Sequence, residues 1–134
     1  RCGFVLGAAD LIEAMTTVID PYAVSIAVAD IAEQALSEAG IRAMRARVVT
    51  TKENRALLVE GLQKLPQVEK VFEASANFAL VRFKDADKIM AGLARSDIYI
   101  RDQQHMPGLK NCLRISVGTK TEIEAVLKAI EGII

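Results

Sequence analysis

The sequence predicts an α+β or α/β fold, in which a small mixed or antiparallel sheet carries helices on one face and follows a strand and two helices. Three patterns predict it: helical spacing of apolar residues over 41–65, alternation of apolar and polar residues over 77–83 and 112–117, and helical spacing again over 123–130. With 134 residues, of which 51% are hydrophobic, the chain is long enough for a compact core.

The first forty residues predict elements that have no obvious partner in the rest of the chain. A strand is expected over 1–7, and two helices follow, the second over 26–36 with Ser25 as its cap. A strand and two very apolar helices look like the edge of another domain. We therefore expect one unit over residues 1–41 and a second over residues 42–134.

The remaining residues predict a layered unit that can bury its own core. Gly40 is expected to interrupt the helical pattern, and a long helix is expected over 41–65. Asp85 is expected to cap a short helix, and Thr119 with Glu122 has the spacing of a capping box. Four strands are expected, at 68–72, 77–83, 97–102 and 112–117.

Composition excludes several classes of partner. Lys and Arg total 17 and Asp and Glu total 17, so bulk attraction to nucleic acid or to an anionic membrane is not expected. Charged residues break the most apolar stretch, over 11–36, which therefore predicts no membrane span. Cys2 and Cys112 lie far apart and form no metal-ligand pattern, so we expect reduced thiols in a cytoplasmic protein.

Two arginines are the strongest candidates for a binding site. Arg114 stands within the alternating run 112–117, with the small residues Cys112 and Ser116 on its side of the strand. Arg101 ends the preceding expected strand. Two arginines near one sheet edge could bind a phosphate or a carboxylate through paired hydrogen bonds, and two solvated side chains are the alternative.

Three further features of the sequence bear on its chemistry. The loop 102–111 contains Pro107 and Gly108 and could fold over a ligand. The only histidine, His105, has no acidic or cysteine partner at metal-ligand spacing, so no metal site is predicted. Arg1 precedes a flexible glycine and is a third anion-binding candidate, with a structural role as the alternative. No nucleophile or general base is predicted.

Five segments in this order resemble the C-terminal part of histidinol-phosphate aminotransferases: "RCGFVLG", "DPYAVSIAVADIAEQALS", "NFALVRF", "YIRDQ" and "CLRISVGT". These enzymes belong to the pyridoxal-phosphate family with the aspartate aminotransferase fold, and the resemblance covers essentially all 134 residues. It implies that residues 1–41 are the end of a large cofactor-binding domain with a connecting helix. It likewise implies that residues 42–134 are the C-terminal small domain.

The resemblance also implies roles for the three arginines. Arg1 matches an arginine that contacts the cofactor phosphate, Arg114 one that binds the anionic group of the substrate, and Arg101 one that helps to hold the substrate phosphate. The parent enzyme would be a homodimer that transfers an amino group between glutamate and imidazole-acetol phosphate through pyridoxal phosphate, with glutamate and histidinol phosphate as its anionic substrates.

One departure from the family pattern limits what this chain is expected to do. The lysine that forms the Schiff base lies upstream of the motif containing Arg1, so it is missing here and no catalytic residue is assigned. We expect a fragment that is inactive alone, does not retain the cofactor, and self-associates through residues 8–36. Two alternatives remain: a free-standing anion-binding α+β module, or a related aminotransferase or decarboxylase with another phosphorylated substrate.

Overall fold

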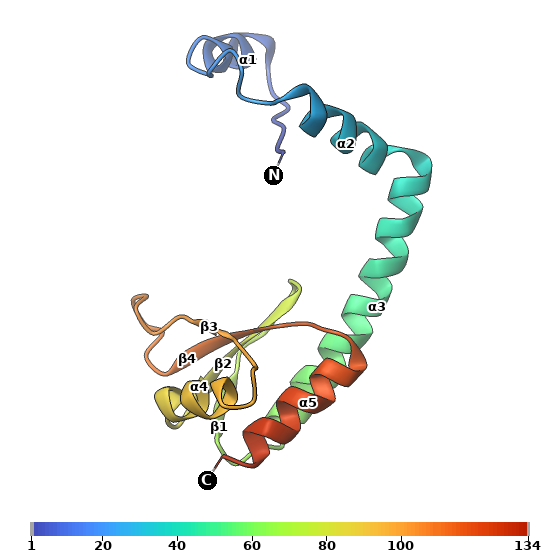
Figure 1. The fold of residues 1–134 in the computed structure, drawn as a ribbon. Helices are drawn as coiled ribbons and strands as arrows, with labels where there is room; N and C mark the ends of the chain where they lie inside the picture. The colour runs from blue at the N-terminus through green and yellow to red at the C-terminus, as the bar shows by residue number, and fades with distance from the viewer. Residues whose placement is uncertain (1, 134) are drawn as a thin grey trace. The chain divides into compact units, whose positions relative to one another are not determined.

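The computed structural model describes residues 2–133, and these form five helices and one four-stranded sheet (Figure 1). The chain separates into two compact units, Arg1–Ala46 and Arg47–Ile134. This division falls further along the chain than the one expected after residue 41. Assignment of the two parts to a large and a small domain of a longer protein stays a prediction.

The first unit contains α1 (Ala9–Thr16), α2 (Ile26–Leu36) and the start of α3 (Glu38–Gln63). The expected cap of α2 is confirmed, because the hydroxyl of Ser25 accepts a hydrogen bond from the backbone N–H of Val28 at 3.4 Å. The expected strand over 1–7 is wrong for its described part, since residues 2–8 have no regular structure. A strand needs a neighbour for its backbone hydrogen bonds, and these residues have none.

The break between the second and third helices lies at Ser37 and not at the expected Gly40. Ser37 has a ψ of 160°, which ends α2. Its hydroxyl then accepts a hydrogen bond from the backbone N–H of Gly40 at 3.1 Å, as an N-cap does for a new helix. Gly40 therefore lies inside the first turn of α3, where a Cβ atom would clash with the carbonyl oxygen of Ala35.

The second unit is built on an antiparallel sheet with the strand order β1-β2-β4-β3, which confirms the predicted small sheet. Its strands are β1 (Val68–Val71), β2 (Phe78–Phe83), β3 (Arg101–Asp102) and β4 (Cys112–Ser116). The expected strand over 97–102 is therefore reduced to two residues. Asp97 has a φ of 56°, and the N–H of Ile98 donates to the carbonyl of Leu93 at 3.0 Å, so this segment is held at the end of a helix and cannot pair with β4.

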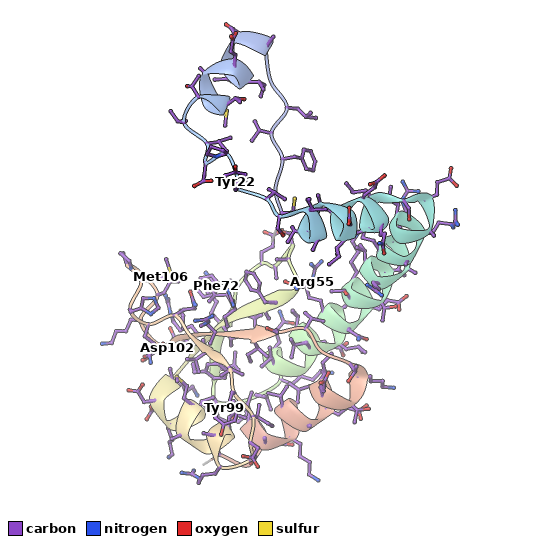
Figure 2. The ribbon with its side chains drawn as sticks, turned by 45° about the horizontal axis from the view of Figure 1, so that its top comes forward. Tyr22, Arg55, Phe72, Tyr99, Asp102 and Met106 are labelled. Atoms are coloured by element: carbon purple, nitrogen blue, oxygen red, sulfur yellow. The ribbon has the colours of Figure 1, made fainter. Side chains whose placement is uncertain are left out.

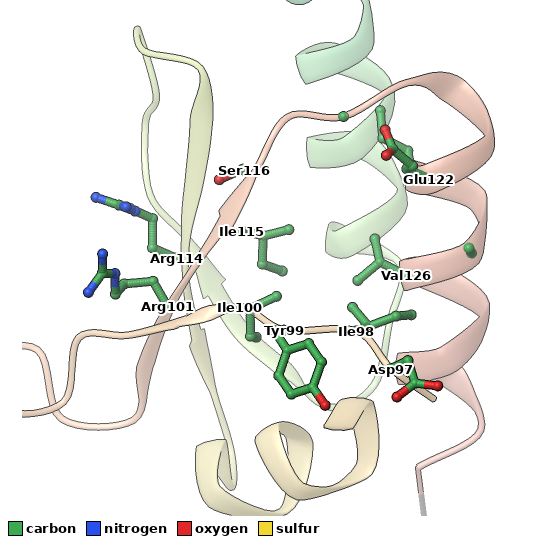
Figure 3. A pocket seen from close by; sticks show the side chains of 13 residues that line it. Asp97, Ile98, Tyr99, Ile100, Arg101, Arg114, Ile115, Ser116, Glu122 and Val126 are labelled. Carbon is green, nitrogen blue, oxygen red and sulfur yellow. The ribbon is translucent and has the colours of Figure 1, made fainter. Parts of the chain in front are cut away.

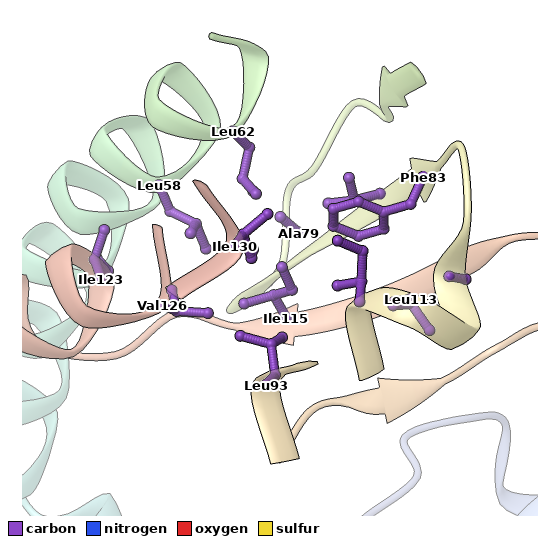
Figure 4. Packing of buried hydrophobic residues seen from close by; sticks show 13 residues of the cluster. Leu58, Leu62, Ala79, Phe83, Leu93, Leu113, Ile115, Ile123, Val126 and Ile130 are labelled. Carbon is purple, nitrogen blue, oxygen red and sulfur yellow. The ribbon is translucent and has the colours of Figure 1, made fainter. Parts of the chain in front are cut away.

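Helices cover one face of this sheet, as predicted. The second half of α3 packs there with α4 (Ala86–Ala94) and α5 (Lys120–Glu131), and Figure 4 shows their apolar side chains meeting those of β2 and β4. The largest fully buried side chains of this core are Phe83, Leu58, Leu62, Leu93, Leu113, Ile130 and Val81. The side chains that alternate with these core residues along β2 and β4 point to the other face of the sheet, which we call the open face.

The structure confirms the two predicted helix caps of the second unit, at Asp85 and Thr119. The carboxylate of Asp85 accepts a hydrogen bond from the N–H of Lys88 at 3.0 Å and caps α4. Thr119 and Glu122 form a complete capping box at the start of α5. Across residues 2–133, no helix combines the length and the apolar character that crossing a membrane requires.

The capping box lowers the pKa of Glu122 from its ordinary value of 4.5. The main cause is the hydrogen bond from the backbone N–H of Thr119 at 2.7 Å, and the Thr119 hydroxyl adds a second at 2.9 Å. A carboxyl group with a lowered folded pKa stabilises the fold above its ordinary pKa and loses this effect as the pH falls through the folded value.

We predict that Glu122→Gln, which keeps the shape of the capping box but removes its charge, lowers the urea midpoint of unfolding at pH 6. The difference from the unchanged chain should shrink as the pH falls below 4.5 and vanish under more acidic conditions. Urea titrations at several pH values measure it. Glu124→Gln, in the same helix but outside the box, is the control. A Glu122→Gln difference that is constant with pH would contradict the assignment.

Candidate anion-binding site

Arg101 and Arg114 lie directly opposite each other on neighbouring strands. They are cross-strand partners in the β3–β4 ladder, next to the pair formed by Asp102 and Leu113. Because Leu113 and Ile115 on either side of Arg114 are buried in the core, alternation directs Arg114 to the open face. Figure 3 shows the two arginine side chains running side by side in the same direction. The sequence-predicted residues are thus brought together.

This arrangement places two positive charges together without an acidic partner. Like charges directly opposite on paired strands destabilise a sheet. Among residues 2–133, the ion pairs of the structure are Arg42 with Glu38 and Lys64 with Glu60, so no carboxylate there neutralises either Arg101 or Arg114. An anion between the two guanidinium groups would remove this repulsion.

Arg114 also has a hydrogen-bond donor that lacks a partner. Its Nε is buried and donates to no acceptor among the described residues. A buried donor without an acceptor costs free energy, more so when it belongs to a charged group. The guanidinium carbon lies 5.1 Å from the centre of the Phe78 ring, which orients the group by a cation–π contact. The guanidinium group is therefore oriented by the ring, and its Nε is a donor without an acceptor.

The two arginines border a cavity of about 710 Å³ at the edge of the sheet. Side chains of Ile98, Ile100 and Val126 form an apolar part of its wall between the sheet and α5 (Figure 3). The residues that line the whole cavity are Asp97, Ile98, Tyr99, Ile100, Arg101, Arg114, Ile115, Ser116, Gly118, Glu122, Ile123, Ala125 and Val126. Figure 3 shows the guanidinium groups of Arg101 and Arg114 pointing away from Ile98 and Val126, so the apolar part of the cavity lies on the opposite side of the sheet from these groups.

Residues of this cavity do not fit a pyridoxal aldehyde. Such a group needs a lysine amine for its imine, and no lysine is among the lining residues. Arg1, to which the sequence assigns contact with the cofactor phosphate, lies outside the described residues. The lining of this cavity therefore offers no amine that could hold the reactive end of the cofactor.

The loop between the arginines is anchored on several sides. The Nε2 of Gln104 donates to the carboxylate of Asp87 at 2.9 Å, and the carboxylate of Asp102 accepts from the N–H of Gln104 at 2.8 Å. Sequence reasoning expected a loop that could fold over a ligand, and that motion stays a prediction. His105 is exposed in this loop, and no group of metal-binding side chains occurs within residues 2–133.

Phe78 and Arg82 are open-face residues that sequence reasoning did not single out. Phe78 lies beneath Arg114, and Arg82 donates two hydrogen bonds to the loop that joins β3 to β4. Both alternate with the buried Ala79, Val81 and Phe83 of β2. The alternation in "FALVRF" was the available signal, because it places the first and fifth residues on the same face as Arg114.

Comparisons with known proteins identify close relatives of the whole chain. Residues 1–130 match the family model described as Aminotransferase class I and II. The chain is 43% identical over 131 residues to histidinol-phosphate aminotransferase 2 of Mannheimia succiniciproducens, covering 98% of this chain and 37% of that protein. It is 47% identical to the histidinol-phosphate aminotransferase of Yersinia pseudotuberculosis, covering 97% of this chain and 34% of the relative. The chain thus spans about a third of the length of these relatives.

Solved structures show the same fold. A putative aminotransferase from Burkholderia pseudomallei has a TM-score of 0.83 at 26% identity, over 93% of this chain and 37% of the other. The histidinol-phosphate aminotransferase from Clostridium acetobutylicum has a TM-score of 0.83 at 21% identity, over 92% of this chain and 37% of that one. These likenesses confirm the predicted fold class.

We predict that Arg101→Gln stabilises the chain when no multivalent anion is present, because it relieves the repulsion from Arg114. The expected gain in the free energy of unfolding is about 0.2–1 kcal/mol, measured by urea denaturation. The same variant should lose the stabilisation that inorganic phosphate gives at constant ionic strength. Arg95→Gln, which removes an equal charge at the end of α4, is the control and should not be stabilised. A loss of stability in Arg101→Gln without phosphate would contradict the repulsion.

Proposed function

Because the chain belongs to the aminotransferase class I and II family, we propose that it supplies the substrate-anion site of a longer histidinol-phosphate aminotransferase. The observation that carries the proposal is the cross-strand pair of Arg101 and Arg114, with a buried Nε that lacks an acceptor. Relatives with that name, 43% and 47% identical over nearly the whole chain, support the choice of substrate. Histidine biosynthesis is then the pathway of the longer protein.

The arginine pair suits a reaction in which two different anions use one site in turn. Glutamate presents a carboxylate, and histidinol phosphate or imidazole-acetol phosphate presents a phosphate. A planar guanidinium group forms paired hydrogen bonds with either of them, and each charge-assisted bond contributes about 1.5–3 kcal/mol. In this proposal Arg114 binds the anionic group of either substrate. Arg101, which is exposed, adds a second cation that favours the phosphate.

Pyridoxal phosphate would supply the electron sink for amino-group transfer in the longer protein. Of the residues in this chain, the family resemblance assigns only Arg1 to its phosphate. We propose that the Schiff-base lysine is supplied outside these 134 residues, so that the chain alone neither retains the cofactor nor catalyses transfer. The role of this chain is to bind and orient the anionic end of the substrate.

A different phosphorylated substrate is the second candidate. The structural neighbours include an L-threonine-O-3-phosphate decarboxylase from Porphyromonas gingivalis, which has a TM-score of 0.77 at 21% identity and so shares the fold. A phosphate-binding arginine pair would serve such a substrate equally well. A panel of amino acids and phosphorylated amino alcohols, tested on the longer protein, separates the two candidates.

In the longer protein, we predict that Arg114→Lys raises the KM for glutamate and for histidinol phosphate by about tenfold or more, because an ammonium group cannot form paired bonds. The absorbance spectrum of the bound cofactor should stay unchanged, since Arg114 is proposed to contact substrate alone. Steady-state kinetics and absorbance spectra measure both. Unchanged substrate kinetics, or loss of the cofactor spectrum, would overturn the assignment of Arg114.

For the chain alone, we propose self-association through apolar side chains of residues 8–36. Val18, Tyr22, Ile26 and Ile31 are 67–91% exposed, and surfaces of this kind in water favour association. Sedimentation velocity should show a mass that rises with concentration. Ile31→Glu should shift the population toward monomer, whereas Glu124→Gln should not. Monomer mass at every concentration would exclude this proposal.

A further inference from the structure

Arg82 ties the loop between the two site arginines to the body of the sheet. It lies on β2, where its ladder partner is Cys112 of β4. Its Nε donates to the carbonyl oxygen of Lys110 at 3.2 Å, and its Nη2 donates to that of Gly108 at 2.8 Å. Both carbonyls belong to the loop that joins β3 to β4. Since β2 and β3 flank β4 on opposite sides, one guanidinium holds this loop across the central strand.

The burial of Cys112 shows that this end of the loop is closed over the open face. Alternation along β4 places Cys112 on the same face as Arg114, away from the core, and Cys112 is not part of the core cluster. Its side chain is nevertheless fully buried. Its Sγ donates to the carbonyl of Lys110 at 3.5 Å, the carbonyl that Arg82 also binds. The loop and Arg82 therefore enclose it together.

Strand β3 depends on such an anchor because it is very short. It contributes two ladder pairs, Arg101 with Arg114 and Asp102 with Leu113. The N–H of Gln103 adds one bond to the carbonyl of Cys112 at 3.1 Å, and a strand this short depends on further contacts to stay in place. The loop leaves β3 directly after Asp102 and returns at Cys112, with Gly108 at a φ of 76° in its turn. Movement of the loop would therefore move Arg101.

Arg82 is itself held in one orientation. Its guanidinium carbon lies 5.4 Å from the centre of the Phe72 ring, which follows β1 (Figure 2). The Nζ of Lys70 lies 4.8 Å from the centre of the same ring. A stacked, planar group with two hydrogen bonds is a rigid connection, whereas an ammonium group on a flexible stem is not.

We propose that Arg82 is a positioning residue for the anion site. By holding the carbonyls of Gly108 and Lys110, it keeps β3 paired with β4 and so keeps Arg101 opposite Arg114. Two of the three guanidinium nitrogens of Arg82, Nε and Nη2, already donate to the loop, so we assign Arg82 to positioning and not to anion binding. The inference rests on the proposed anion site, and it adds a residue on which the affinity of that site depends.

The test is an NMR titration of this chain with inorganic phosphate at constant ionic strength. Arg82→Lys keeps the positive charge but cannot bond both carbonyls, and we expect it to weaken phosphate binding by about tenfold, since small displacements of a binding group are costly. Lys70→Gln is the matched control: it removes a charge from the same ring without touching the loop, and its phosphate affinity should equal that of the unchanged chain.

A double variant distinguishes positioning from a general structural effect. If Arg82 acts by placing Arg101, then Arg82→Lys should cause no further loss of phosphate affinity in an Arg101→Gln chain. Equal losses in both backgrounds would overturn the proposal. So would full affinity in Arg82→Lys, which would mean that only the charge of Arg82 matters.

The outcomes separate this inference from the proposed function. Absence of phosphate binding in the unchanged chain, or binding that Arg101→Gln leaves intact, would overturn the anion site and the role of Arg82 with it. Binding that depends on Arg101 but not on Arg82 would overturn the role of Arg82 alone. If Arg82→Lys does not give a dispersed amide spectrum, Phe72→Leu removes the ring that orients Arg82 and must weaken phosphate binding for the inference to stand.

Discussion

The antiparallel register between β2 and β4 is the constraint on which both the core and the arginine pair depend. Leu80 lies opposite Arg114 and Val81 lies opposite Leu113, so each strand sends one set of side chains into the core and the other to the open face. A slip of one residue would bury Arg114 and expose Leu113. The helices α3, α4 and α5 stabilise this register because they bury only one of the two faces.

Without a bound anion, the electrostatic interaction between Arg101 and Arg114 on the open face is unfavourable. The two arginines are adjacent, form no ion pair within residues 2–133, and include a buried Nε without an acceptor. Features that cost stability commonly mark functional sites. The rest of the open face supports this placement, since Phe78 lies under Arg114 and Arg82 holds the loop that follows Arg101. Binding an anion would turn an unfavourable pair into a favourable one.

Sequence reasoning worked where a short pattern specifies a structure. Alternation in "NCLRISVGT" placed Arg114 opposite the core, and the caps at Ser25, Asp85 and Thr119 depend on side chains within a few positions of the backbone they bind. It failed where the outcome depends on distant partners. Residues 2–8 have strand-like composition but no neighbouring strand.

The shortened strand at 97–102 and the contacts of Arg82 were missed for the same reason, because both depend on distant partners. Residues 97–100 are apolar enough for a strand, yet Ile98 is bound to the end of α4. The role of Arg82 was hidden because its acceptors are backbone carbonyls, of Gly108 and Lys110, which belong to a loop more distant in the sequence. The pattern of side chains in a sequence does not indicate hydrogen bonds to backbone carbonyls of a distant segment. The pairing of Arg101 with Arg114 could therefore be expected from sequence, whereas the contacts of Arg82 with the loop required the structure.

The most direct test of the central claim is the NMR signal of the Arg114 Nε–H during addition of inorganic phosphate, with sodium chloride adjusted to keep the ionic strength constant. This donor has no acceptor in the described chain, so a bound anion should change its environment more than that of any other arginine. The account predicts a saturable shift of this signal that is absent in Arg101→Gln. A signal that does not respond to phosphate would contradict an anion site at the arginine pair.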